Sequence, residues 1–166
     1  MDLLERLLKH DAWTTRQLLF LCVNITDEQL DRDFDIGHRT ARATFLHIIR
    51  NIEVWSDLMS GLPVRADEAN EPPGRAVERM IARLDRAAAD LALIAQEVAL
   101  RDAWDERWID HIDNPPTEKT FGGGIAHVIT HGMHHRAHLL YMLRRCGVSE
   151  LPEGDVFSWE KQSGTF

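Results

Sequence analysis

The chain has 166 residues, of which 44% are hydrophobic and 28% are charged, and its formal net charge is -8. This composition predicts one soluble globular domain over residues 1–166, with enough chain to bury a core. Because the 19 basic residues form no run or stripe, we expect neither nucleic acid nor an anionic membrane surface as a partner.

The N-terminal segment, residues 2–24, predicts a helix. Charged side chains at Asp2, Glu5 and Arg6 interrupt its apolar pattern, whereas a secretory signal would carry an unbroken apolar run. The longest apolar run, residues 18–23, is too short to span a bilayer. We therefore expect no targeting or membrane-spanning segment.

The two cysteines, Cys22 and Cys146, both lie in apolar stretches that predict helices. Buried free thiols are the simplest interpretation, and they indicate a reducing compartment, which we take to be the cytoplasm. Burial would also raise the pKa of each thiol, so neither cysteine is expected to be an efficient nucleophile.

Residues 25–30 predict a short helical turn, because Thr26 and Gln29 have the spacing of a capping box. A polar loop is expected over residues 31–39, where Gly37 permits a tight turn.

A second long helix is predicted over residues 40–60, ended by Gly61 and Pro63. It carries apolar residues on two sides, so we expect it to contact two neighbours, as in a bundle. The same excess of apolar surface leads us to expect a homodimer. His47 lies away from the main apolar stripe, so periodicity alone favours a surface or boundary position for it.

Residues 61–74 are predicted to be a linker, and residues 75–99 a third long helix whose charges are mostly solvated. Residues 100–121 break the helical pattern and predict a crossover with extended segments and a weak hairpin.

A fourth long helix is predicted over residues 122–146, between a run of glycines and Gly147. The tail, residues 147–166, is predicted to be a loop that is pinned to the bundle by Val156, Phe157 and Trp159. Four long helices with long connections predict an all-α fold of the four-helix-bundle type.

The fourth helix carries five of the nine histidines on one face: His127, His131, His134, His135 and His138. On a helical wheel His135 lies about 60° and His131 about 100° from the centre of the apolar face, and the other three lie nearer solvent. His131 and His135 are four residues apart, so both imidazoles can reach one metal ion. The same spacing occurs elsewhere in the cluster, and exposed histidines without a ligand are the alternative.

Two further features of this helix have open interpretations. Arg136 lies within the apolar arc, where an unpaired charge is costly, so it either pairs with an acid from another helix or anchors an anionic substrate. The glycine run at 122–124 is either a hinge or an anion site made by free backbone amides.

Three segments together resemble the DinB/YfiT-type family of metal-dependent enzymes: WTTRQLL, FLHIIRNIEVW and HVITHGMHHRAHLLYMLRRCG. The similarity covers essentially the whole chain and implies a DinB-like four-helix bundle. It also implies that one divalent metal is bound by a histidine on the second long helix and two histidines on the last. The matching residues here are His47, His131 and His135.

One departure from that family pattern follows HHR, where relatives often have Gly-Gln and this chain has Ala137 and His138. Ala137 keeps the small side chain, while His138 adds an imidazole that could act as a base or orient a ligand.

Three imidazoles leave positions open on a divalent ion, so such a site can activate a bound water or thiol. Zinc and nickel are our first choices of metal, with iron and manganese as alternatives, and binding should weaken below about pH 6 as imidazole takes up protons. The resemblance implies transfer of a low-molecular-weight thiol to a small electrophile, with the thiol as external nucleophile and no side chain assigned as catalytic. A metal-dependent hydrolase and a non-enzymatic stress-response or binding protein with a structural metal are the alternatives.

Overall fold

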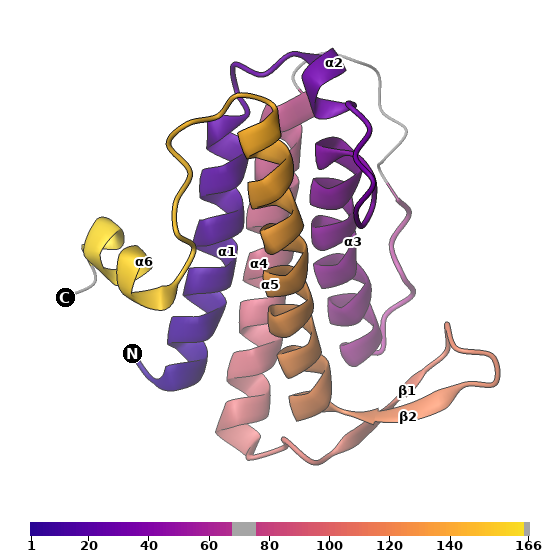
Figure 1. Ribbon diagram of the computed structural model, residues 1–166. Coiled ribbons are helices and arrows are strands. Elements are labelled where there is room, and N and C mark those ends of the chain that lie inside the picture. The colour runs from indigo at the N-terminus through magenta and orange to yellow at the C-terminus, as the bar shows by residue number, and fades with distance from the viewer. Residues whose placement is uncertain (68–75, 165–166) are drawn as a thin grey trace.

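Four long helices make up most of the computed structural model, which describes residues 1–67 and 76–164 (Figure 1). They are α1 (Leu3–Leu21), α3 (Ala41–Met59), α4 (Ala76–Arg101) and α5 (Phe121–Arg145). Both α1 and α3 pack against α4 and α5, so the four helices form a ring around one core. The predicted all-α four-helix bundle is therefore confirmed.

The direction of the helices explains the long connections. In Figure 1, α1 and α5 run upward while α3 and α4 both run downward. Because α3 and α4 are parallel, the chain between them must return from the lower to the upper end of the bundle. Residues 61–67 of the predicted linker lack helix or strand, and its remainder, with the expected helix start at Arg75, lies outside the described residues.

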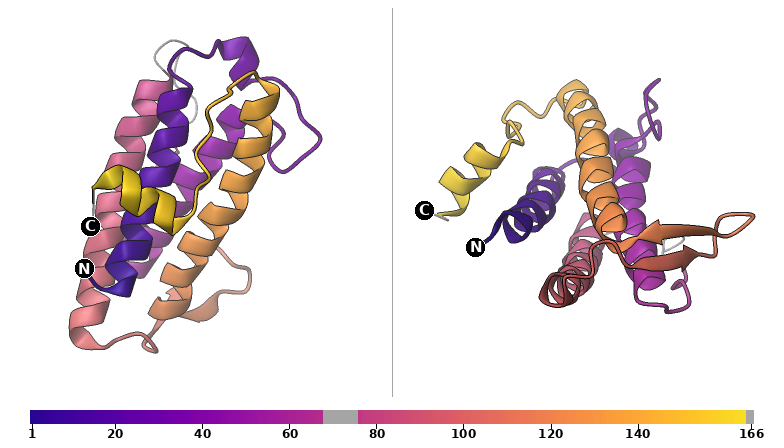
Figure 2. Two further views of the ribbon diagram at one scale, coloured as in Figure 1. Left: turned by 60° about the vertical axis from the view of Figure 1, so that its left-hand side comes forward. Right: turned by 90° about the horizontal axis from the view of Figure 1, so that it is seen from below.

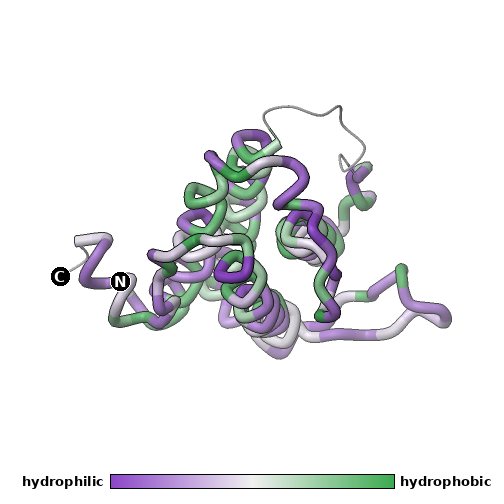
Figure 3. The backbone as a smooth tube through the Cα atoms, turned by 45° about the horizontal axis from the view of Figure 1, so that its top comes forward, coloured by the Kyte–Doolittle hydropathy of each residue, from purple (hydrophilic) through white to green (hydrophobic). Residues whose placement is uncertain are grey.

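Each long helix whose beginning is fully described starts at a side chain that caps it. Asp2 accepts a hydrogen bond from the amide of Glu5, and Thr40 and Thr120 do the same for the third residue after them. Figure 3 shows apolar and polar residues alternating around the bundle helices, as expected when one side of each helix is buried. The largest fully buried side chains in the core come from all four long helices: Phe45, Leu18, Leu19, Ile48, Ile49, Leu84, Ile125, Leu139, Met142 and Leu143.

Two short elements agree with the sequence. The capping box of Thr26 and Gln29 begins α2 (Asp27–Leu30), with both of its reciprocal hydrogen bonds present. The crossover before α5 contains an antiparallel hairpin of β1 (Arg107–Asp110) and β2 (Thr117–Thr120), with Trp108 opposite Lys119. The hairpin leaves the lower end of the bundle (Figures 1 and 2).

The tail corrects one prediction, because it contains a helix, α6 (Val156–Ser163), that packs on the outside of α1 (Figure 2). Asp155 caps it, and Trp159, only 3% exposed, makes an edge contact with the ring of His10. Phe157 does not pin the tail, since it is 80% exposed. Eight residues are too few for a helical period to be recognised, and Phe157 lies about 200° around the helix from Trp159.

The two apolar sides of α3 are both used inside the chain. One contributes to the interface with α4 and the other to the interface with α5, and α3 also contacts β1. These stripes therefore do not in themselves require a second subunit, and the homodimer stays a prediction. Within residues 1–67 and 76–164, no helix combines the length and apolar character needed to cross a membrane.

Candidate metal centre

Three imidazole rings meet where α3 faces α5: His47 comes from the second turn of α3, and His131 and His135 come from successive turns of α5. The Nε2 atom of His131 lies 3.3 Å from Nε2 of His47 and 3.3 Å from Nε2 of His135. These separations are long for nitrogen–nitrogen hydrogen bonds. They match the edge of a tetrahedron of nitrogen ligands at about 2.0–2.1 Å from a zinc ion, which is about 3.3–3.4 Å.

The surroundings of these rings keep them neutral, as ligation requires. Burial, together with the charges of neighbouring histidines, lowers the pKa of His47 to about 4 and that of His135 to about 3. The pKa of His131 is also lowered, mainly by burial. In the folded protein His47 and His135 therefore stay deprotonated well below pH 6, so metal loss should begin at a lower pH than ordinary imidazoles would give.

The second ring nitrogen of two of these residues has no partner in the protein. Within the described residues, the Nδ1 atoms of His131 and His135 are buried without a hydrogen bond. Metal-binding histidines usually donate their other N–H to an acceptor. Here the rings are oriented by contacts with one another, such as the T-shaped contact between His131 and His135.

A fourth histidine, which the sequence did not single out, joins this cluster. His38 lies in the loop before α3, and its ring stacks on that of His47 with centroids 3.8 Å apart. The ligand atoms of His38, His47 and His135 all lie within 4.8 Å of one another. No helical period applies in a loop, so the only signal was the presence of a histidine shortly before the helix that carries His47.

The remaining histidines of α5 surround the cluster. His127 and His134 are exposed, as predicted, and the ring of His127 lies 5.0 Å from His131 and 4.7 Å from Trp55. His138 differs from the prediction, because it is only partly exposed and its Nδ1 atom is buried. The reason is the loop before α3, whose Gly37 packs directly against the His138 ring.

A second group that could hold a metal consists of His134, His135 and His138. Both groups found among the described residues contain histidines only, and they share His135. Neither group is the predicted set, although Nε2 of His131 lies 3.3 Å from Nε2 of both His47 and His135. The assignment of His47, His131 and His135 as the ligands therefore stays a prediction.

Arg136 has a structural role and is not part of the histidine cluster. Its guanidinium donates to the Asp11 carboxylate at 2.5 Å and to the Thr15 hydroxyl at 3.2 Å, and both charged side chains are 5% exposed. The pairing with an acid from another helix is confirmed, which leaves no free charge for a substrate.

Two of the three glycines that open α5 have amides that are already hydrogen-bonded. The amide of Gly122 donates to the carbonyl of Trp104, and that of Gly123 donates to the hydroxyl of Thr120. Phe121 likewise donates to the carbonyl of Glu106. With the amides of Gly122 and Gly123 occupied, the structure favours the alternative to an anion site at residues 122–124.

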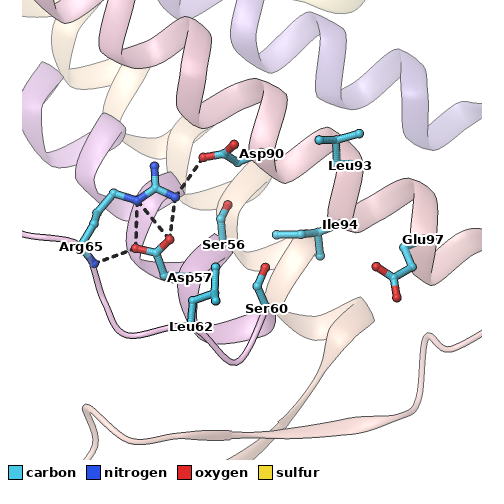
Figure 4. Close-up of a pocket in the computed structure, with 9 residues that line it drawn as sticks. All are labelled: Ser56, Asp57, Ser60, Leu62, Arg65, Asp90, Leu93, Ile94 and Glu97. Atoms are coloured by element: carbon cyan, nitrogen blue, oxygen red, sulfur yellow. Dashed lines mark hydrogen bonds and ion pairs between the residues drawn. The ribbon is translucent and has the colours of Figure 1, made fainter.

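A polar network outside the cluster lies in a pocket between α3 and α4 (Figure 4). There Arg65 binds the carboxylates of Asp57 at 2.6 Å and Asp90 at 2.9 Å. Burial raises the pKa of Asp57, but the hydrogen bonds and charge of Arg65 outweigh it and lower the pKa overall. Because these charges satisfy one another, the network fastens the chain after α3 and is not a candidate for metal binding.

Comparison of the chain with known protein families identifies its family. The family model described as DinB family matches residues 1–161. The chain belongs to the DinB family. Among curated proteins, none shows significant similarity to it. This DinB protein is therefore a helical bundle with histidine groups that could bind a metal ion.

Proposed function

We propose that this DinB protein binds one divalent metal ion through His47, His131 and His135 and uses it to transfer a low-molecular-weight thiol to a small electrophile. The observation that carries the proposal is that Nε2 of His131 lies 3.3 Å from Nε2 of His47 and 3.3 Å from Nε2 of His135. Zinc and nickel suit three neutral imidazoles best, with iron and manganese as alternatives. A divalent ion held there would lower the pKa of a thiol bound beside it.

The cysteines of the chain support an external nucleophile. Cys22 is fully buried, donates a hydrogen bond to the carbonyl of Leu18, and has its pKa raised by burial to about 12. Burial also raises the pKa of Cys146, whose thiol donates to the carbonyl of Gln29. Both thiols therefore stay protonated at neutral pH. Cys22 is also inaccessible, whereas Cys146, which was expected to be buried, is only partly so. Two free cysteines also fit a reducing compartment such as the cytoplasm.

The electrophile would lie against an aromatic wall beside the cluster. The ring of His127 contacts both His131 and Trp55, and the ammonium of Lys119 lies 4.9 Å from the Trp55 ring centre. In the reaction the thiol gives up its proton, its sulfur forms a bond to the electrophilic carbon, and the leaving group departs with the bonding electrons. Lys119 is paired with Asp110 and Asp113, which fix its ammonium beside Trp55 and offset its charge.

The test is turnover by metal-loaded protein with small electrophiles, measured with and without a low-molecular-weight thiol. Untagged protein is used, and its metal content is determined first. The variant with both Cys22→Ser and Cys146→Ser should keep thiol-transfer activity, whereas His135→Ala should lose it. A folded, metal-loaded cysteine variant without activity would refute the external-thiol mechanism.

The same experiment separates the alternatives. Turnover without a thiol would support a metal-dependent hydrolase. Metal binding that strongly raises the melting temperature, with no turnover under any condition, would support a structural metal in a stress-response or binding protein.

We retain the homodimer as part of the proposal. Several apolar side chains next to the hairpin are exposed: Leu62 at 59%, Ile109 at 49% and Ile112 at 58%. Exposed apolar area of this kind is a candidate contact between copies. Sedimentation showing monomer alone at tens of micromolar would remove this part.

A further inference from the structure

We propose that His38 is a fourth metal ligand, carried by a loop, that closes the metal centre at rest and leaves it when an external thiol binds. The inference rests on the proposed metal site of His47, His131 and His135. It adds a residue and a regulatory step that the three-histidine site does not contain.

The first argument is position. His38 lies over His47, with ring centroids 3.8 Å apart and planes 31° apart, and its ring centroid is 5.0 Å from that of His135. Its ligand atom lies within 4.8 Å of those of both residues. His38 therefore approaches two of the three predicted ligands.

The second argument is coordination. Three ligands leave at least one position of a tetrahedral ion open, and a fourth protein ligand gives a closed site. His47, His131 and His135 come from two facing helices, whereas His38 comes from the loop between α2 and α3. Since the side chain of His38 is exposed, a change in its own torsion angles can bring it to the ion or take it away.

The third argument is that the loop is built to hold His38 at this place. The amide of Phe34 donates to the carbonyl of Arg39 at 2.7 Å, and the amide of Arg39 donates back to the carbonyl of Ile36 at 2.9 Å. Phe34 is buried and makes an edge contact with Tyr141 on α5. The base of the loop is thus anchored on both sides of His38.

The backbone next to His38 is unusual on both sides. Gly37 has a φ of 51° and Arg39 a φ of 70°, which is uncommon for a residue with a side chain. A Cβ atom on Gly37 would lie 2.5 Å from Nδ1 of His138. Close packing of Gly37 on His138 therefore sets how near His38 comes to the cluster, and it gives His138 a positioning role.

In the reaction, the imidazole of His38 and the external thiolate would compete for one position on the metal ion. A thiolate is a stronger ligand for a divalent ion than a neutral imidazole, so it can take the place of His38 while the three helix-borne histidines remain. The metal would then be protected from other ligands until the thiol arrives.

The test is a cobalt(II) titration of untagged protein, followed by absorption spectroscopy, with 2-mercaptoethanol as the thiol. His38→Ala removes the ring, and His38→Phe keeps a ring that can stack on His47 but cannot ligate. The control is His111→Ala, which removes an exposed histidine from the hairpin turn. Circular dichroism of the metal-free variants checks that each is folded.

Both His38 variants should bind cobalt at least about tenfold more weakly than wild type, the lower limit of what loss of even an outer-shell partner costs. Their visible spectra should change, 2-mercaptoethanol should bind their cobalt forms more tightly, and His111→Ala should match wild type. If His38→Phe binds cobalt with the affinity and the spectrum of wild type, the proposal is overturned. The ring of His38 would then only cover His47 and would not be a ligand. Failure of wild type to bind cobalt would overturn the metal site itself as well.

Discussion

His135 and Arg136 are neighbours in the sequence, yet their side chains lie at different helix interfaces and differ in how their polar atoms are satisfied. Arg136 faces α1, where Asp11 and Thr15 accept its hydrogen bonds. His135 faces α3, where its ring makes an edge contact with that of His47, and its Nδ1 atom has no partner in the described protein. Both residues are buried, at 7% and 4% exposed.

The difference indicates what each interface is for. A buried ion pair with all its hydrogen bonds made stabilises one packing of two helices, and Gly132 leaves the space for it, since a Cβ there would lie 2.9 Å from Asp11. Buried imidazoles without partners cost stability and are retained where a ligand satisfies them. The α1 side of α5 is therefore structural, and the α3 side carries the histidine groups that could bind a metal ion.

The largest loss of stability is expected when one partner of the Asp11–Arg136 ion pair is removed. Asp11→Ala leaves the Arg136 charge buried without a partner, which should lower the free energy of unfolding by about 3–5 kcal/mol. Urea unfolding of the metal-free protein measures it. Replacing the pair together, with Asp11→Leu and Arg136→Met, should recover much of the loss. A single-variant loss below about 1 kcal/mol would mean that the pair does not hold α1 to α5.

Removing a predicted ligand should abolish the stabilisation that a bound metal gives. Metal at 1,000 times its dissociation constant should stabilise wild type by about 4 kcal/mol, and His131→Ala or His135→Ala should lose most of that gain. Urea unfolding with and without zinc, together with elemental analysis, measures both effects. His111→Ala serves as the control. Full metal content in either ligand variant would rule out the predicted site.

The sequence predicted those parts of the molecule that depend on local pattern. The long helices follow from apolar periodicity, and the turn at Thr26 follows from its capping spacing. His131 and His135 could be selected because both lie on one helix, where the angle to the apolar face orders the candidates. His47 needed the family resemblance, since it lies off the main stripe of its own helix.

The sequence could not predict contacts that only tertiary packing creates. His38 joins the cluster through the path of a loop, which has no period. The charges of the third long helix were expected to be solvated, but Arg83 is 4% exposed and pairs with Glu53 through two hydrogen bonds of 2.6 Å. A pattern that counts charged residues as polar cannot recognise a charge whose partner comes from another helix.

The last effect concerns pH and applies to the metal-free protein. In the unfolded chain the histidines take up protons near their ordinary pKa of 6.5, whereas burial keeps the pKa of His47 near 4 and that of His135 near 3. Between these lowered pKa values and 6.5, the unfolded state binds more protons than the folded state. The free energy of unfolding therefore rises with pH in that range. The stability linked to these two neutral rings is fully present above about pH 6.5. It is lost progressively as the pH falls toward about 4 for His47 and about 3 for His135.

The dependence should be shallower once one buried imidazole is removed. Urea unfolding of metal-free wild type, His135→Ala and His111→Ala at a series of pH values from about 4 to 7 measures the slope. His111→Ala should follow wild type, because this residue is exposed. A slope in His135→Ala equal to that of wild type would show that the α3 side of α5 does not carry the cost of burying neutral imidazoles. Only the Asp11–Arg136 pair would then support a difference in role between the side of α5 that faces α1 and the side that faces α3.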